Sequence, residues 1–386
     1  MALTAAACLL LEKPMAPAPT RAALLTGRLL SLDQFRGYTV AAMFLVNYGG
    51  NFAAMPAVLK HHNTYCSLAD TVMPQFLFAV GFALRLVVLR NLNQTGARTT
   101  WLRALRRIGL LLVVGLAFYH LNWDTTRWDG LLHPIWRPWG VADLWRDAFQ
   151  TLVHIAVTSL WVLPVIAAAA RPRLLFGVGS GLLHLGLSAW FWYELLHEKK
   201  VIDGGPAGFL TWTIPALAGS FAYDFRQERG ARGALRPLLQ WGGLLMLLGY
   251  LISCLGAGGH LAAPPFFPPH VPVDLWTMSQ RAGSLSYLTF AAGFSLAVYA
   301  GFVWLCDLHH KKLALFTILG ANALAAYLVH AWVDVPFSWL RDTPRLDEYA
   351  RFPLALPLAL LLTAGFIATS TFLVWCLNRR GWFLRL

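Results

Sequence analysis

The feature that most constrains the fold of this chain is a series of long apolar segments. A helix needs about 20 mostly apolar residues to cross a bilayer, and about ten segments of that kind divide the sequence. They begin near Tyr38, Thr71, Ala104, Phe149, Leu174, Gly208, Leu235, Leu285, Leu313 and Phe352. Because 58% of the 386 residues are hydrophobic and only 13% are charged, a soluble globular surface is excluded. The sequence therefore predicts an all-α, polytopic integral membrane helix bundle of about ten transmembrane helices.

The distribution of Lys and Arg predicts the orientation of this bundle. If the N-terminus is cytoplasmic, the inner connections hold about twice as many Lys and Arg residues as the outer ones, in accord with the positive-inside rule. Both termini are then cytoplasmic. The net charge of +13 is a topology signal and does not indicate a nucleic-acid partner. We expect an integral protein of the cell (inner) membrane whose main partner is the lipid bilayer, and we leave a homodimer open.

The first residues of the chain do not fit the pattern of membrane-spanning segments. Residues 1–28 contain a short apolar run, ALTAAACLLL, which has no basic residues before it and is too short to span a membrane. We therefore expect a disordered cytoplasmic tail over residues 1–28, in preference to a cleaved signal, and one transmembrane domain over residues 29–386. The five cysteines are scattered without a CxxC pair, so neither a disulfide framework nor a zinc motif is predicted.

A polar cluster stands at the start of the second apolar segment. Residues 59–78 read LKHHNTYCSLADTVMPQFLF and contain His61, His62 and Asp70. A carboxylate beside an imidazole fixes the tautomer of the ring, raises its basicity and stabilises the imidazolium. This composition suits a general base or a nucleophile for acyl transfer. The alternative is a solvated histidine pair in a loop, with Asp70 capping the helix that follows, and residue spacing does not separate the two.

Other polar side chains lie within apolar segments. Asn47, Asn322 and His330 are expected to be buried and to need partners, since lipid offers none. The predicted topology places Asn47 and His330 in the outer leaflet, at the depth of the histidine pair, although each alone could serve helix packing. Arg85 lies near the basic end of its segment and is expected to extend to the interface. No pair of these histidines has the i, i+4 spacing of metal ligands, so no metal site is predicted.

Four stretches of the sequence point to a family. They are SLDQFRGYTVAAMFLVNYGG, LADTVMPQFLFAVG, SLSYLTFAAG and LGANALAAYLVH. In this order, over roughly residues 29 to 380, the chain resembles the transmembrane heparan-alpha-glucosaminide N-acetyltransferases and their bacterial relatives. The resemblance implies that residues 29–386 form an acyltransferase domain. It also implies transfer of an acetyl group from cytosolic acetyl-CoA, as co-substrate, to an amino sugar or sugar hydroxyl of an extracytoplasmic glycan.

The resemblance also implies roles for individual residues. The histidine of the family lies between the Asn-containing motif and the Ala-Asp motif, where this chain has only His61 and His62. The Lys before the pair favours His61, while the lengths of the loop leave the choice open. Asn47 would position or polarise the acyl group, and Asp70 would support the histidine. A further pair would line the core, namely Asn322 and His330.

Basic residues near the cytoplasmic side are candidates for binding the donor. The stretch RNLNQTGARTTWLRALRR could pair with the phosphates of acetyl-CoA through charge-assisted hydrogen bonds. The candidates are Arg103, Arg106 and Arg107, together with Arg36 in the first motif. For any single one of these arginines, the positive-inside rule alone is the stronger explanation. Ala207 replaces the acid of the family's Pro-Glu-Gly, so heparan sulfate itself is not assumed as the acceptor.

A second class of function uses the same residues. Intramembrane His and Asp side chains also suit a transporter or flippase that moves a lipid-linked glycan or a small solute without acyl chemistry. Specific binding of coenzyme A separates the two classes.

Overall fold

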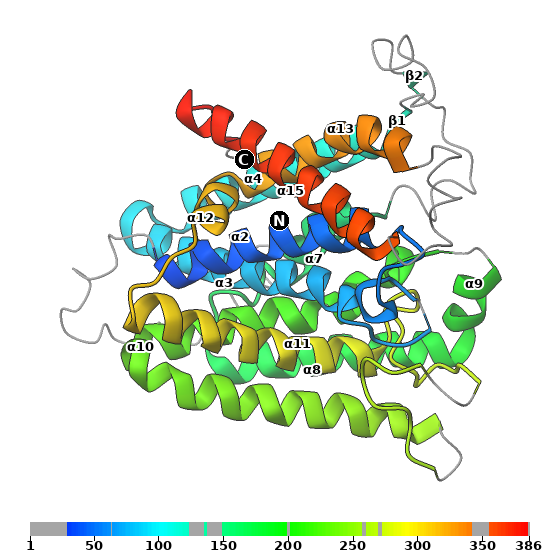
Figure 1. Cartoon of the computed structure of the whole chain (residues 1–386). Coiled ribbons are helices and arrows are strands. Elements are labelled where there is room, and N and C mark those ends of the chain that lie inside the picture. Colours follow the sequence, from blue (N-terminus) through cyan, green and yellow to red (C-terminus); the bar gives the residue numbers. More distant parts are fainter. Residues whose placement is uncertain are drawn as a thin grey trace.

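The computed structural model describes residues 29–62, 64–122, 135–136, 149–198, 201–256, 260–268, 272–341 and 355–384, and these residues are mainly helical (Figure 1). The expected tail, residues 1–28, lies outside them, as does most of the tryptophan-rich connection between residues 121 and 147.

The described elements are mostly helices. The α-helices are α2 (Leu30–Phe44), α3 (Val72–Thr95), α4 (Ala97–His120), α7 (Thr151–Val162), α8 (Ala170–Leu187), α9 (Tyr193–Glu198), α10 (Phe209–Ser253), α11 (Leu285–Phe302), α12 (Ala314–Ala321), α13 (Ala323–Arg341) and α15 (Ala355–Arg379). Short π- or 3-10-helical turns extend them: η2 (Leu45–Gly49), η3 (Ala57–Leu59), η4 (Ala69–Thr71), η5 (Ser188–Trp192), η6 (Gly205–Ala207), η7 (Cys254–Gly256) and η8 (Val303–Leu308). Two strands of two residues, β1 (Leu121–Asn122) and β2 (Ile135–Trp136), pair antiparallel.

Six helical runs of the described residues are long and apolar enough to cross a membrane. They are Ala69–Thr95, Ala170–Glu198, Gly205–Gly256, Leu285–Leu308, Ala323–Arg341 and Ala355–Arg379. The expectation of an all-α integral membrane protein is confirmed. The count of ten crossings and the cytoplasmic termini stay predictions.

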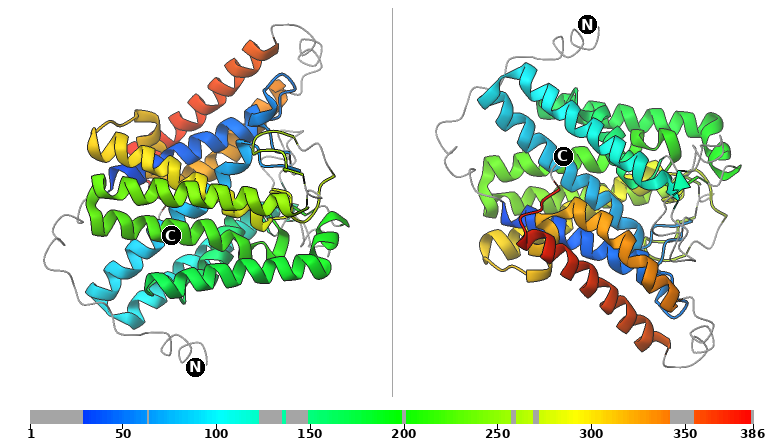
Figure 2. Two further views of the ribbon diagram at one scale, coloured as in Figure 1. Left: turned by 90° about the horizontal axis from the view of Figure 1, so that it is seen from below. Right: turned by 90° about the horizontal axis from the view of Figure 1, so that it is seen from above.

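The longest run holds two of the predicted segments. Gly205–Gly256 has 52 residues, more than twice what a span requires. Inside it Gly230 has φ 68° and ψ −173°, a conformation that glycine adopts without a steric penalty. The chain turns at this kink, and the two halves of α10 run side by side (Figures 1 and 2). Residues of both halves, including Ala222 and Leu238, share one buried cluster.

α2 lies at the centre of the bundle, between two groups of helices (Figure 1). On one side Phe35 and neighbouring residues of α2 pack with α3, α10 and α11. On the other side, Val40 and Phe44 pack with α12, α13 and α15. A further cluster joins α4 and α7 to the ends of α3 and α10.

α3 and α10 approach each other so closely that only glycine fits at the crossing. A Cβ atom on Gly81 would lie 1.7 Å from the carbonyl oxygen of Ala216, and one on Gly219 would lie 1.9 Å from that of Phe78. The two glycines, one from each helix, therefore set the distance between α3 and α10. This crossing fixes how the starts of the two helices are placed relative to each other.

Arg85 is not at the interface. Its side chain is buried, its Nε donates to Asp224 Oδ1 at 2.6 Å, and its Nη1 donates to the carbonyl oxygens of Ile166 and Ala168. Arg173, which is fully buried, binds the other oxygen of Asp224. The expectation of an interfacial Arg85 is wrong because its partners lie on α10 and after α7, where spacing along α3 gives no information.

Candidate active site

Three helices begin at the same end of the bundle, and the residues just before them form the candidate site. The loops that precede α3, α10 and α11 gather at the right in Figure 1. The Tyr287 hydroxyl in the first turn of α11 donates to the backbone oxygen of Asp70 at 2.6 Å, which ties the start of α11 to that of α3. Since helix N-termini carry partial positive charge, this end of the bundle favours carboxylates.

His61 and Asp70 are paired. The imidazole Nδ1 lies 2.8 Å from Asp70 Oδ1, and the carboxylate is fully buried whereas 36% of the His61 side chain is exposed. The ring is thus held by a buried anion while part of its surface stays exposed. The sequence predicted this pairing, although not which histidine would make it.

The two carboxylate oxygens of Asp70 have different hydrogen-bond partners. Oδ2 accepts hydrogen bonds from the backbone nitrogen and the hydroxyl of Ser67, both at 2.9 Å, and Ser67 Oγ accepts from the Asp70 backbone nitrogen at 3.2 Å. This reciprocal arrangement resembles a capping box and starts the helical turn that leads into α3. Oδ1 is left for His61. Asp70 can therefore cap the helix and support His61 at the same time, because each role uses a different oxygen.

Two residues absent from the predicted site complete it. His61 Nδ1 also lies 3.1 Å from Gln280 Oε1, and Gln280 Nε2 donates to Asp203 Oδ1 at 2.9 Å. Asp203 is 3% exposed and has φ 55°. Gln280 is 219 residues from His61 in the chain, so no local spacing could have found it. The one signal for Asp203 is its position before the Gly-Gly-Pro turn that opens α10.

The surroundings determine the protonation of His61. Burial acts to lower its pKa, but the hydrogen bond and charge of Asp70, the charge of Asp203 and the Gln280 hydrogen bond outweigh burial and raise the pKa above its ordinary value. Burial raises the pKa of Asp203 to about 6, against the opposing effects of Gln280 and His61. A more basic imidazole whose side chain is partly exposed can take a proton or attack a carbonyl.

His62 is placed differently from its neighbour. Its Nε2 donates to the carbonyl oxygen of Ala57 at 2.7 Å, and its ring stacks on Tyr65 with centroids 4.7 Å apart. Both contacts hold the loop together. The contacts of His62 are thus with its own loop, whereas His61 contacts Asp70 and Gln280.

Asn47 lies near this loop but is not buried. It stands in the π-helical turn η2, its side chain is exposed, and its backbone oxygen accepts a hydrogen bond from Asn51 Nδ2 at 2.7 Å. The expected burial is wrong because the helix unwinds there and turns the residue outward. A Cβ on Gly50 would lie 3.1 Å from the Leu59 oxygen, so η2 contacts the loop that leads to His61.

Asn322 and His330 have local partners. Asn322 Nδ2 donates to the carbonyl oxygen of Trp382 at 2.8 Å, and its Oδ1 accepts from the Leu384 nitrogen at 3.0 Å. This amide holds the segment that follows α15. His330 is half-buried, stacks on Phe44 and bonds to the Tyr327 carbonyl oxygen. No hydrogen bond recorded for the described residues links either side chain to His61, and their binding roles stay predictions.

The predicted donor-binding arginines lie on two helices. Arg103, Arg106 and Arg107 are exposed on α4, and their spacing of three and four residues places them on one face. Arg36 is half-buried on α2. Nothing in the geometry tests their contact with a donor. Among the described residues, no group of three or more His, Cys, Asp or Glu side chains is arranged to hold a metal ion.

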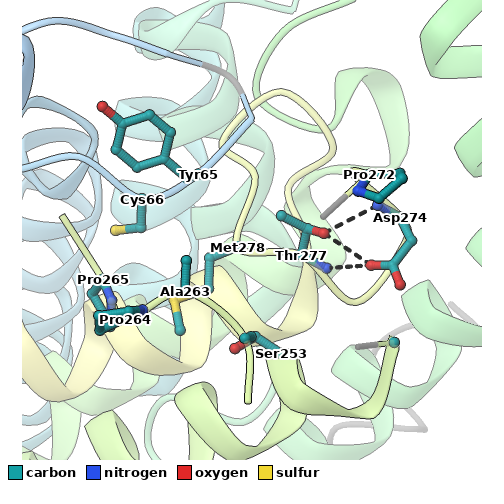
Figure 3. Close-up of a pocket in the computed structure, with 12 residues that line it drawn as sticks. Tyr65, Cys66, Ser253, Ala263, Pro264, Pro265, Pro272, Asp274, Thr277 and Met278 are labelled. Carbon is teal, nitrogen blue, oxygen red and sulfur yellow. Dashed lines mark hydrogen bonds between the residues drawn. The ribbon is translucent and has the colours of Figure 1, made fainter. Parts of the chain in front are cut away.

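A small pocket lies beside the site (Figure 3). Tyr65 and Cys66 form one wall, and residues that include Pro264, Pro265 and Met278 form the opposite one. The Phe266 nitrogen donates to the Cys66 oxygen at 2.8 Å and joins the two walls. The pocket has a volume of about 30 Å³, which suits water molecules and is too small for a sugar ring.

Comparison with known proteins supports a distant relationship. The chain is 30% identical to the human heparan-alpha-glucosaminide N-acetyltransferase over 131 residues. The matched region is 32% of this chain and covers 19% of that protein's length. No family model matches the sequence. The suspected resemblance is thus supported over part of the chain, and together with the apolar helices it fits a membrane acyltransferase.

Proposed function

We propose that this protein is a membrane acetyltransferase that transfers the acetyl group of acetyl-CoA to an amino group, or a hydroxyl, on a sugar of an extracytoplasmic glycan. The observation that carries the proposal is the pairing of an exposed imidazole with a fully buried carboxylate in a chain related to an N-acetyltransferase. The cell (inner) membrane is the compartment that fits a cytosolic donor and an acceptor on the far side.

His61 performs the chemistry in this proposal. With Nδ1 directed to Asp70, its Nε2 takes the proton from the acceptor nitrogen or oxygen as that atom bonds to the thioester carbonyl carbon. The carbon–sulfur bond breaks, and the leaving thiolate of coenzyme A receives the proton from the imidazolium. Alternatively, Nε2 attacks the carbonyl carbon first and expels the thiolate. The acceptor then attacks the acetyl-imidazole, the bond between the acetyl carbon and Nε2 breaks, and the freed imidazole takes the acceptor's proton and passes it to the thiolate. Asp70 stabilises the positive imidazole in both routes.

The donor reaches the site from the cytosolic side. Its phosphates would pair with Arg103, Arg106 and Arg107, which present three guanidinium groups on one helix face. Arg36 is the fourth candidate contact on this path. The acyl end would then extend between the helices to His61, with Asn47 near the acyl oxygen.

Substituting each histidine in turn tests the proposal. His61→Ala should lower acetyl transfer from acetyl-CoA to a glucosamine-terminated oligosaccharide by about 10²- to 10⁴-fold, the usual contribution of a general base. His62→Ala is the matched control and should keep most of the activity, because the described contacts of its ring are with Ala57 and Tyr65 of its own loop. Transfer is measured by mass spectrometry of the acceptor after purification of inserted, monodisperse protein. Full activity in His61→Ala contradicts the proposal.

Binding of the donor is a separate test. A ligand present at about 100 times its dissociation constant adds about 2.7 kcal/mol to apparent stability. Coenzyme A should therefore raise the melting temperature of the purified protein. The triple variant Arg103→Gln, Arg106→Gln, Arg107→Gln should show a smaller rise. No rise at millimolar coenzyme A favours the transporter alternative.

A further inference from the structure

Besides the bond to Asp70, a second series of hydrogen bonds links His61 to another carboxylate, that of Asp203. They run from His61 Nδ1 to Gln280 Oε1 over 3.1 Å and from Gln280 Nε2 to Asp203 Oδ1 over 2.9 Å. Asp203 is almost fully buried and precedes α10, whereas Gln280 precedes α11. Three segments that are distant in the sequence thus meet at one ring.

We propose that Asp203 and Gln280 are positioning residues for His61, in which the Asp203 carboxylate fixes the orientation of the Gln280 amide and this amide fixes the tautomer of the imidazole. The inference rests on the proposed role of His61 as base or nucleophile. It adds two residues to that site, neither of which touches the reacting atoms.

The chemistry of the donors and acceptors supports this assignment. An ionised carboxylate only accepts hydrogen bonds, so Gln280 must turn its NH₂ group toward Asp203 and its oxygen toward His61. The oxygens of Gln280 and Asp70 that face Nδ1 are both acceptors, so Nδ1 carries the proton. The lone pair is then on Nε2, the nitrogen away from these partners. The reactive nitrogen is therefore determined by groups on the opposite side of the ring.

The backbone around Asp203 is anchored on both sides. The Trp212 indole nitrogen donates to the Asp203 carbonyl oxygen at 2.8 Å, and the Gly204 nitrogen donates to the Arg281 carbonyl oxygen at 2.9 Å. The second bond joins the turn that carries Asp203 to the residue after Gln280. Asp203 and Gln280 therefore move as one unit, which keeps their side chains in register.

The charges near His61 determine the direction of the expected effect. Asp70 and Asp203 are the anions at the ring. The cations close by in the chain are engaged elsewhere: Lys60 Nζ donates to the Ala53 oxygen, and Arg281 Nη2 donates to the His197 oxygen. His62, which is adjacent, contacts the Ala57 oxygen. Loss of the Asp203 charge should make the imidazolium less stable.

The test uses the full-length protein in detergent and two readouts. The first is the pH dependence of kcat/KM for acetyl transfer, whose rising limb reports the base of the free enzyme. The second is the rate at which diethyl pyrocarbonate modifies His61, followed by peptide mass spectrometry as a function of pH. The variants are Asp203→Asn, chosen because Asn tolerates positive φ, and Gln280→Met. Glu194→Gln is the control, since it removes an exposed carboxylate of α9.

In Asp203→Asn both midpoints should fall by about half to one pH unit, because an attractive charge near the ring is lost. Gln280→Met should also lower both midpoints and should reduce kcat about tenfold, a fraction of what a general base supplies, with the KM for acetyl-CoA unchanged. Glu194→Gln should leave all values as in the wild type.

Unchanged midpoints in Asp203→Asn overturn the proposal, because a purely structural residue would lower the yield of folded protein without moving them. If Asp203→Asn does not fold, Gln280→Met decides, and unchanged kcat and midpoints in that variant overturn the proposal. If His61→Ala retains activity, the proposed function fails. The carbethoxylation of His61 then still reports whether Asp203 and Gln280 act on the ring.

Discussion

His61 and His62 are adjacent in the sequence, and their surroundings differ because of residues elsewhere in the chain. His61 meets Asp70 and Gln280, whereas His62 turns to the carbonyl oxygen of Ala57 and stacks on Tyr65. Neighbouring residues in an extended loop project their side chains in different directions, so one ring faces the helix starts and the other faces the loop. The choice between them is made by tertiary structure.

Asp203 should reduce stability at neutral pH. Burial raises its pKa from 3.8 to about 6, so the folded state holds the proton more tightly than the unfolded state does. The stability gained from this protonation is fully present below about pH 4 and is lost as the pH rises through about 6. Asp203→Asn removes this dependence. Between pH 4.5 and pH 7.5, the free energy of unfolding of the variant should rise relative to that of the wild type by on the order of 2 kcal/mol. Melting temperatures of the two proteins at both pH values measure this change. A constant difference between the two proteins across this range would contradict the prediction.

The sequence predicted part of the site because part of it is local. His61 and Asp70 are nine residues apart in a polar stretch before an apolar segment, and a carboxylate near an imidazole is a recognisable pair. Gln280 and Asp203 come from two other connections, and an amide in a long loop has no pattern of its own. Asn47 was misjudged because apolar neighbours indicated burial, whereas the π-helical turn rotates its side chain outward.

At the scale of the helix, close contact between backbones holds the bundle. The crossing of α3 and α10 leaves no space for a side chain at Gly81 and Gly219, since their Cβ atoms would overlap backbone carbonyls of the partner helix. Helices in membranes often pack through small residues in this way. The sequence showed the glycines but not which helix each one would face.

Gly219→Ala should destabilise the protein strongly. A methyl group 1.9 Å from the Phe78 oxygen forces the two helices apart, and overpacking of this kind costs about 1–3 kcal/mol or more. The melting temperature in detergent measures the effect. Gly179→Ala in α8 is the control, because a Cβ there meets no atom within 4 Å, and it should be neutral or slightly stabilising. Equal melting temperatures for the two variants would count against this packing.

The ion pair between α3 and α10 gives a second test at this scale. Asp224→Asn leaves the buried guanidinium groups of Arg85 and Arg173 without their shared anion. Removing one partner of a buried pair costs about 3–5 kcal/mol, so little folded protein should be recovered. Glu228→Gln, one turn further along α10 and exposed, should have a small effect. Normal yield and melting temperature in Asp224→Asn would show that the network is dispensable.

At the scale of the molecule, the apolar segments were sufficient to predict a helical membrane protein. Segment length and hydropathy depend only on local composition, and six helical runs of the described residues meet the requirement for a span. The reversal between the segments that begin near Gly208 and Leu235 was expected from the basic stretch between them. That helix continues on both sides of the single residue Gly230 was not predicted, because a basic stretch containing glycine indicates a loop. The hydrophobic pattern of a segment does not show which other helix it will contact, because that depends on how the side chains of the two helices fit together.

Orientation is testable with the whole protein. The distribution of Lys and Arg predicts that the His61 loop faces outward and the connection between α11 and α12 faces the cytoplasm. In a variant whose five native cysteines are replaced, Thr64→Cys should react with a membrane-impermeant maleimide in intact cells, and Lys311→Cys should react only after permeabilisation. Both positions are exposed, so access to the reagent is comparable. The reverse pattern would invert the topology.

The anchoring of His61 has a consequence for how the loop can vary. The ring is held by Asp70 and Gln280, which lie just before α3 and α11, and residues 51–60 supply none of the hydrogen bonds that the structure describes for it. Insertions or deletions in that stretch can therefore be absorbed without displacing the imidazole. Related chains with loops of other lengths before the histidine could keep the same reactive geometry, so loop length is a poor guide to whether such a chain retains its chemistry.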